Sequence, residues 1–129
     1  MNQGNDDTKA AVIGEGGLAF VTRSLGLGTS AARLAQELAR DYPDGQIDVD
    51  LKGASAEPLS PAQVMAHVVR AFEPEGKLPE SEAELAGKYR SVLAERRVLL
   101  LFDNARDREQ VEPLIPPPGC LLLVTSRQH

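Results

Sequence analysis

Hydrophobic residues along the chain follow two alternating patterns, one typical of strands and one typical of helices. The apolar runs "VLLLF" (98–102) and "CLLLVTS" (120–126) predict strands that are buried on both faces of a sheet. In "QIDVDL" (46–51) apolar and acidic residues alternate with a period of two, which predicts an edge strand with one face in water. A further strand lies within "AAVIGEGGLAFVT" (10–22). Because helix-like segments separate these strands, we expect an α/β fold with a mainly parallel sheet.

Four helices are indicated by capping residues and by apolar residues spaced three or four positions apart. The caps are Thr29 or Ser30, then Ser60 followed by Pro61, then Ser81 with Glu84 in a capping-box pattern, and finally Asp107. The apolar stripes of the first three helices are Ala31, Leu34, Ala35, Leu38 and Ala39; then Val64, Met65, Val68, Val69 and Phe72; then Leu85, Tyr89, Val92 and Leu93. The fourth helix is short and ends at Leu114, before "PPPG".

Composition indicates one globular domain without a nucleic-acid surface. The chain has 129 residues, 42% of them hydrophobic, and a net charge of -5. Its single cysteine, Cys120, excludes an internal disulfide and fits a reducing, cytoplasmic compartment. No apolar run is long enough to span a membrane, and the polar start "MNQGNDDTK" is unlike a signal peptide. We expect residues 1–10 to form a disordered tail and residues 11–129 to form the domain.

The stretch "RRVLLLFDNARD" places a carboxylate where an apolar strand ends. In open α/β sheets ligands bind beyond the carboxyl ends of the strands, so Asp103 lies where a nucleotide-bound Mg²⁺ would need an acid. Many strands also end in an aspartate that only caps a turn. This pattern by itself leaves both interpretations open.

Several segments in order resemble the NB-ARC-type nucleotide-binding domain, the ATPase core of the STAND class of P-loop NTPases, as found in bacterial multidomain transcriptional regulators. They are "YPDGQIDVDLKGAS", "EPLSPAQVMAHVVRAF", "YRSVLAERRVLLLFDNARDREQVEPLIP" and "PGCLLLVTSR". The resemblance implies a three-layer P-loop core with a parallel sheet of order 2-3-4-1 and a fifth strand beyond the first. The chain stops before that strand, so we expect only part of such a domain.

The resemblance also assigns roles to three residues. Asp103 matches the Walker B acid that holds Mg²⁺ through water, and Asn104 matches a position that is often a second acid. Asn cannot accept a proton from the attacking water, so hydrolysis is expected to be weak or absent. In "TSR", Arg127 matches the sensor residue that faces the terminal phosphate.

A P-loop, G-x-x-x-x-G-K-[ST], belongs between the first strand and the first helix, and neither candidate stretch contains its lysine. "GEGGLAFV" (14–21) has Ala19, Phe20 and Val21 where Gly, Lys and Thr belong. "GLGTSAAR" (26–33) precedes a helix and is preferred, with "GLAFVT" as the first strand; in its two possible registers Ala31, Ala32 and Arg33, or Ser30, Ala31 and Ala32, occupy those places. Backbone N–H groups at a helix start can still hold an anion. The candidate phosphate-binding residues are Gly26, Gly28, Thr29, Ser30, Ala31 and Ala32.

Two functions therefore stay open. The first is a nucleotide-binding switch that takes ADP or ATP with Mg²⁺. The second is a non-enzymatic interaction module that keeps the fold without the ligand. Without the fifth strand the first strand would be an exposed edge, which predicts self-association or disorder around residues 10–30. "RSLGLG" (23–28) also fits an acetyl-CoA loop, but too little chain precedes it, and neither His67 nor His129 has partners at metal-ligand spacing.

Overall fold

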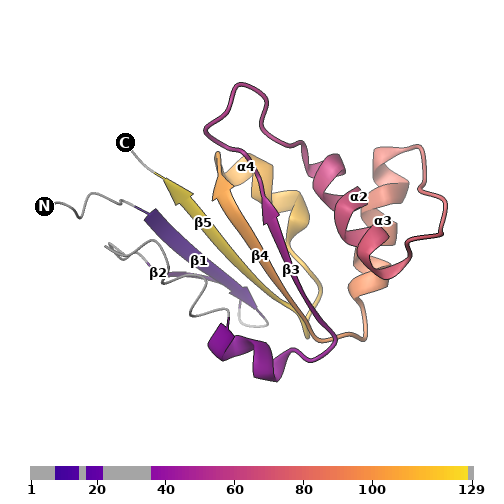
Figure 1. The fold of residues 1–129 in the computed structure, drawn as a ribbon, viewed down its shortest axis with the longest axis horizontal. Coiled ribbons are helices and arrows are strands. Elements are labelled where there is room, and N and C mark those ends of the chain that lie inside the picture. Colours follow the sequence, from indigo (N-terminus) through magenta and orange to yellow (C-terminus); the bar gives the residue numbers. More distant parts are fainter. Residues whose placement is uncertain (1–7, 15–16, 22–35, 128–129) are drawn as a thin grey trace, which may run out of the picture.

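The computed structural model describes residues 8–14, 17–21 and 36–127, which form one mixed sheet covered by helices. The strands are β1 (Thr8–Gly14), β2 (Gly17–Val21), β3 (Gly45–Asp50), β4 (Val98–Ala105) and β5 (Leu121–Arg127). Their order across the sheet is β2-β1-β5-β4-β3 (Figure 1).

Strands β3, β4 and β5 form a parallel trio, as the sequence predicts. Their arrowheads lie at the same end of the sheet in Figure 1. The first five residues of β4 are all buried, whereas the exposed positions of β3 are Gln46, Asp48 and Asp50. The prediction of a central apolar strand and an edge strand with one wet face is therefore confirmed.

The N-terminal strands differ from the expected arrangement. The expectation places "GLAFVT" parallel to β5, but the neighbour of β5 is β1, which runs antiparallel to it, and β2 lies outside β1. Only two residues separate β1 from β2, and so short a connection can join only antiparallel strands; a parallel crossover needs a dozen or more. Residues 8–10 of the expected tail thus belong to β1. Of the stretch for which the sequence predicts self-association or disorder, residues 10–14 and 17–21 are strands, and residues 22–30 lie outside the described part.

Three of the four predicted helices begin at their predicted caps, whereas the cap predicted for the first helix, Thr29 or Ser30, lies outside the described residues. In α2 (Pro61–Phe72) the Ser60 side chain accepts a hydrogen bond from the Gln63 N–H, and the Gln63 side-chain oxygen accepts one from the Ser60 N–H. The two bonds form a capping box. In α3 (Glu82–Leu93) the Ser81 side chain accepts the Glu84 N–H. The short α4 (Arg108–Val111) is capped by Asp107 and continues into the 3-10 turn η2 (Glu112–Leu114). None of the described helices is both long and apolar enough to cross a membrane.

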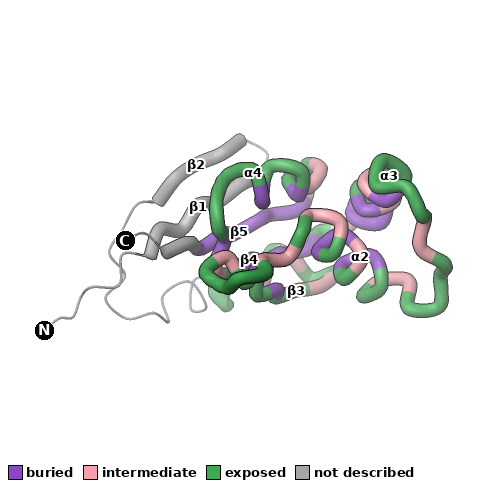
Figure 2. Tube along the Cα trace, turned by 90° about the horizontal axis from the view of Figure 1, so that it is seen from above, coloured by how far each residue is buried: buried purple, intermediate pink, exposed green. Residues whose placement is uncertain are grey.

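Apolar side chains are buried on both faces of the sheet. The larger core joins α2, α3, α4 and η2 to one face, and Figure 2 shows its buried positions along the strands and on one side of α2 and α3. On the other face Leu99, Leu101, Leu121 and Leu123 are buried against Leu38, Ala39 and Tyr42. Leu38 precedes the 3-10 turn η1 (Ala39–Asp41). Of the predicted first helix, the described residues show only the helical residues 36–38 and this turn. Burial on both faces explains the continuous apolar runs in β4 and β5.

Candidate functional site

The carboxyl ends of the parallel strands bring two aspartates side by side. Asp50 at the end of β3 is the register partner of Asp103 in β4. Both carboxylates belong to exposed residues, although Phe102, just before Asp103, is fully buried. Asp103 therefore lies two residues before the carboxyl end of β4 rather than as its last residue, near the edge where ligands of α/β sheets bind.

Asp103 is held by a residue of the neighbouring strand. The hydroxyl of Thr125 in β5 donates a hydrogen bond to Oδ1 of Asp103. The same hydroxyl oxygen accepts the backbone N–H of Asn104 at 3.0 Å. Only 3% of Thr125 is exposed, so this bridge between the strands is shielded from water although the carboxylate at its end is not. The site residues predicted from the sequence did not include Thr125. The signal that could have pointed to it was its place in "TSR", the segment that was already matched to a sensor motif.

The backbone of β4 is irregular at this point. Phe102 pairs with Val124 and Ala105 pairs with Ser126, so the two residues Asp103 and Asn104 lie opposite the single residue Thr125. This two-against-one arrangement is a β-bulge, a feature that redirects side chains at the ends of strands. Asn104 has φ = 62°, in the left-handed region that Asn tolerates better than most residues.

The loop after β3 is tied to this bulge from the other side. The Leu51 N–H donates to the Asp103 carbonyl and the Gly53 N–H donates to the Asn104 carbonyl, both at 2.8 Å. A Cβ on Gly53 would lie 2.4 Å from the Arg106 nitrogen and 2.5 Å from the Asn104 carbonyl oxygen. Such distances are too short for any side chain, so glycine lets the two backbones approach.

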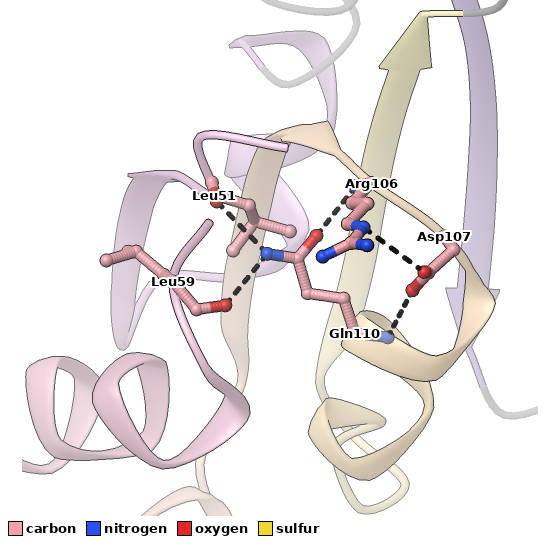
Figure 3. A network of polar contacts seen from close by, with 5 residues as sticks. All are labelled: Leu51, Leu59, Arg106, Asp107 and Gln110. Carbon is pink, nitrogen blue, oxygen red and sulfur yellow. Dashed lines mark hydrogen bonds and ion pairs between the residues drawn. The ribbon is translucent and has the colours of Figure 1, made fainter. Parts of the chain in front are cut away.

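Gln110 also ties the loop after β3 to the end of β4 (Figure 3), and it is not among the site residues predicted from the sequence. Its side-chain N–H₂ donates to the carbonyls of Leu51 and Leu59 at 3.0 and 2.9 Å, and its side-chain oxygen accepts the Arg106 N–H at 2.6 Å. Its own N–H donates to the capping carboxylate of Asp107 at 2.9 Å. Gln110 is only 6% exposed, so its side chain is buried at these bonds, although Arg106 and Asp107 are exposed. The position of Gln110 three residues after a helix cap gave no sign of these bonds.

The other predicted site residues are not brought to this cluster by the described part of the structure. Arg127 is the last residue of β5, where its backbone is in register with Thr8, and its side chain lies outside the description. The preferred phosphate loop lies there as well: Gly26, Gly28, Thr29, Ser30, Ala31, Ala32 and Arg33. The competing stretch 14–21 enters the hairpin, since Gly14 ends β1 and Gly17–Val21 is β2.

Two other titratable side chains, Tyr89 and Cys120, lie beside backbone carbonyl groups and not at the carboxyl ends of the strands. Burial raises the pKa of the Tyr89 hydroxyl, which donates to the Leu114 carbonyl at 2.7 Å and joins α3 to η2. Burial also raises the pKa of the Cys120 thiol, whose Sγ lies 3.4 and 3.3 Å from the carbonyl oxygens of Leu93 and Arg96. His67 is exposed on α2, as expected. Within the described ranges no three His, Cys, Asp or Glu side chains form a metal-binding group.

The oxygen donors that the described residues place at the strand ends are of the kind that Mg²⁺ prefers, but there are too few of them to surround the ion. Carboxylate and hydroxyl oxygens are hard ligands of the kind that Mg²⁺ prefers. Among the described residues, Asp50 and Asp103 supply the carboxylates at this edge; Oδ1 of Asp50 already accepts the Lys52 N–H at 2.8 Å, and Oδ1 of Asp103 accepts the Thr125 hydroxyl. The edge therefore fits a cation that keeps most of its water or takes phosphate oxygens, and it does not fit a cage made of protein ligands alone.

Comparison with known proteins shows relatives among regulators. Regulatory protein AfsR of Streptomyces griseus is 42% identical over 120 residues, which cover 88% of this chain and 12% of that protein. Regulatory protein AfsR of Streptomyces coelicolor is 43% identical over 131 residues, covering 94% of this chain and 13% of that protein. No family model matches the chain, and no solved structure matches it. The chain is thus homologous to a small region of a regulatory protein and spans about an eighth of its relatives' length.

Proposed function

We propose that this chain is a nucleotide-binding switch domain of a regulatory protein, which holds ADP or ATP with Mg²⁺ and hydrolyses the nucleotide slowly or not at all. The observation that carries the proposal is the exposed carboxylate of Asp103 at the carboxyl edge of three parallel strands. Homology to a segment of a protein named as regulatory supports the regulatory part. Resemblance to the NB-ARC domain supports the choice of ligand.

Each residue has a defined task in this proposal. Asp103 orients the water ligands of Mg²⁺, and the bound cation offsets the charge of the phosphates. Backbone N–H groups of residues 26–33 hold phosphate oxygens, and Arg127 pairs with the terminal phosphate. Asn104 cannot take a proton from an attacking water, and neither glycine stretch supplies the lysine that neutralises the β- and γ-phosphates. Binding without efficient turnover follows from this set of groups.

A thermal-shift titration with ADP and ATP, with and without Mg²⁺, tests the proposal. A ligand that binds only the folded chain stabilises it by about 2.7 kcal/mol at one hundred times its Kd. The decisive variant is Asp103→Asn, because an amide oxygen can still accept the Thr125 hydroxyl while the negative charge is lost. Asp48→Asn is the matched control, since Asp48 is also exposed on a strand but lies before the carboxyl edge. A Mg²⁺-dependent shift that Asp103→Asn removes and Asp48→Asn keeps is the expected result.

A second function, a non-enzymatic interaction module, is favoured by one observation. The four lysines of the chain are Lys9, Lys52, Lys77 and Lys88, and none follows a glycine-rich stretch in the P-loop pattern. Such a module would show no shift at millimolar nucleotide. It would instead associate with a protein partner or with itself through an outer strand of the sheet. Sedimentation velocity over a range of concentrations would detect self-association directly.

A further inference from the structure

The hydrogen bonds around Asp103 have a direction that the carboxylate itself fixes, and the backbone N–H of Asn104 adds a second bond to the same hydroxyl. A threonine hydroxyl has one proton to donate. At Thr125 the oxygen accepts the Asn104 N–H, and an ionised carboxylate can only accept, so the proton points to Asp103. The Asn104 N–H reaches Thr125 at the bulge, where Asn104 adopts φ = 62°. The left-handed residue thus anchors the hydroxyl that holds the acid.

Within the described part of the chain, the Thr125 hydroxyl is the partner of the Asp103 carboxylate. Asp103 is exposed, and an exposed aspartate without a partner exchanges between rotamers. Its main chain, in contrast, is held by the Leu51 N–H on the β3 side, and the Gly53 N–H holds the next carbonyl. Backbone contacts therefore fix where the side chain starts, and Thr125 fixes where it points.

The geometry points to Asn104 and Thr125 as positioning residues that keep the Asp103 carboxylate in one orientation, with position 104 taking a residue that tolerates a left-handed backbone. This interpretation differs from the one suggested by sequence, in which Asn104 is only a lost second acid. The inference rests on the proposed function for its purpose, which is to present one free carboxylate oxygen to a nucleotide-bound cation. The positioning itself needs no ligand and can be measured on the free protein.

Two substitutions at position 104 separate the two interpretations. Glycine adopts the left-handed region without strain, whereas alanine does not. We expect Asn104→Ala to melt about 3–8 °C below Asn104→Gly. In an extended strand glycine is the weaker residue, so a higher melting temperature for Asn104→Ala would overturn the requirement for left-handed backbone. Equal melting temperatures would overturn it as well.

The orientation of the carboxylate is read from the three-bond NMR couplings that report χ1 of Asp103, without nucleotide or metal. We expect a single rotamer in the unsubstituted chain, in Thr125→Ser and in Asn104→Gly. Averaged couplings are expected in Thr125→Val, which keeps the shape but loses the hydroxyl, and in Asn104→Ala. A Thr125 that only tied the strands together would change the melting temperature and leave the couplings alone.

The outcomes are independent of the nucleotide titration. Averaging in the unsubstituted chain, or a fixed rotamer in Thr125→Val, would overturn the positioning role even if nucleotide binds. A fixed rotamer that is lost in Thr125→Val would support that role even if no nucleotide shift is found, in which case the proposed function alone fails. Rescue by Thr125→Ser assigns the effect to the hydroxyl rather than to packing.

Discussion

Replacing Gln110 by methionine tests whether this buried side chain holds together the loop after β3 and the end of β4. Methionine has a similar length and no hydrogen-bonding groups. The change removes the bonds to Leu51 and Leu59 and the bond from the Arg106 N–H. Three bonds at about 1 kcal/mol each amount to about 3 kcal/mol of lost stability.

Two features of the structure adjust this figure. The Leu51 carbonyl keeps a second donor, the Leu59 N–H at 3.0 Å, so it does not become unsatisfied. Burying the apolar methionine side chain in place of an amide offsets about 1 kcal/mol. We therefore expect Gln110→Met to lower the free energy of unfolding by about 2 kcal/mol, which corresponds to a melting temperature about 6–10 °C lower for a chain of this size.

Urea unfolding followed by far-UV circular dichroism measures the loss, with an unchanged dependence on urea as the sign that the native state is intact. Glu109→Met is the matched control, because Glu109 is exposed on the same helix and should change stability by less than about 0.5 kcal/mol. Gln110→Glu keeps the acceptor for Arg106 but turns a carboxylate toward two carbonyl oxygens, so it should be at least as destabilising. A loss below about 0.5 kcal/mol for Gln110→Met would refute the reasoning.

Two further predictions concern the same region and the core. Gly53→Ala should destabilise the chain by more than about 2 kcal/mol in urea unfolding, because its Cβ would meet the backbone of Asn104 and Arg106; a loss no larger than for Ala54→Ser would contradict the close approach. Stability should fall as pH rises above about 9, since Cys120 and Tyr89 stay protonated in the folded chain while the unfolded chain loses these protons from their ordinary pKa values of 9.0 and 10.0. Denaturation midpoints at pH 8 and pH 10 measure this loss, and Tyr89→Phe should reduce it; equal midpoints for the unsubstituted chain would show that burial does not hold these protons.

Much of the fold follows from local pattern. The run Val98–Phe102 indicated a buried central strand, and Ser60, Ser81 and Asp107 marked where helices begin, because caps and periodicity depend on neighbours a few residues away. The location of Asp103 near the carboxyl end of β4 followed as well, since a polar residue after a buried apolar run lies toward the end of its strand.

Other features depend on which distant segments become neighbours. The direction of the strand next to β5 depends on which segment pairs with it, and the stretch 10–22 fits either one strand beside β5 or the antiparallel hairpin that the structure contains. The bulge at Asn104 likewise arises from the registers of β4 and β5, which are set by packing across the sheet.

The amino-acid sequence by itself determined the α/β class, the parallel trio of strands, the caps of the helices and the acid at the strand end. Only the tertiary structure decided that Thr125 engages that acid, that Asn104 turns left-handed beside it, and that Gln110 and Gly53 join the loop to the same edge. The physical reason is the range of the interactions. Periodicity and capping act within one or two turns of chain, whereas these contacts join residues between 21 and 59 positions apart.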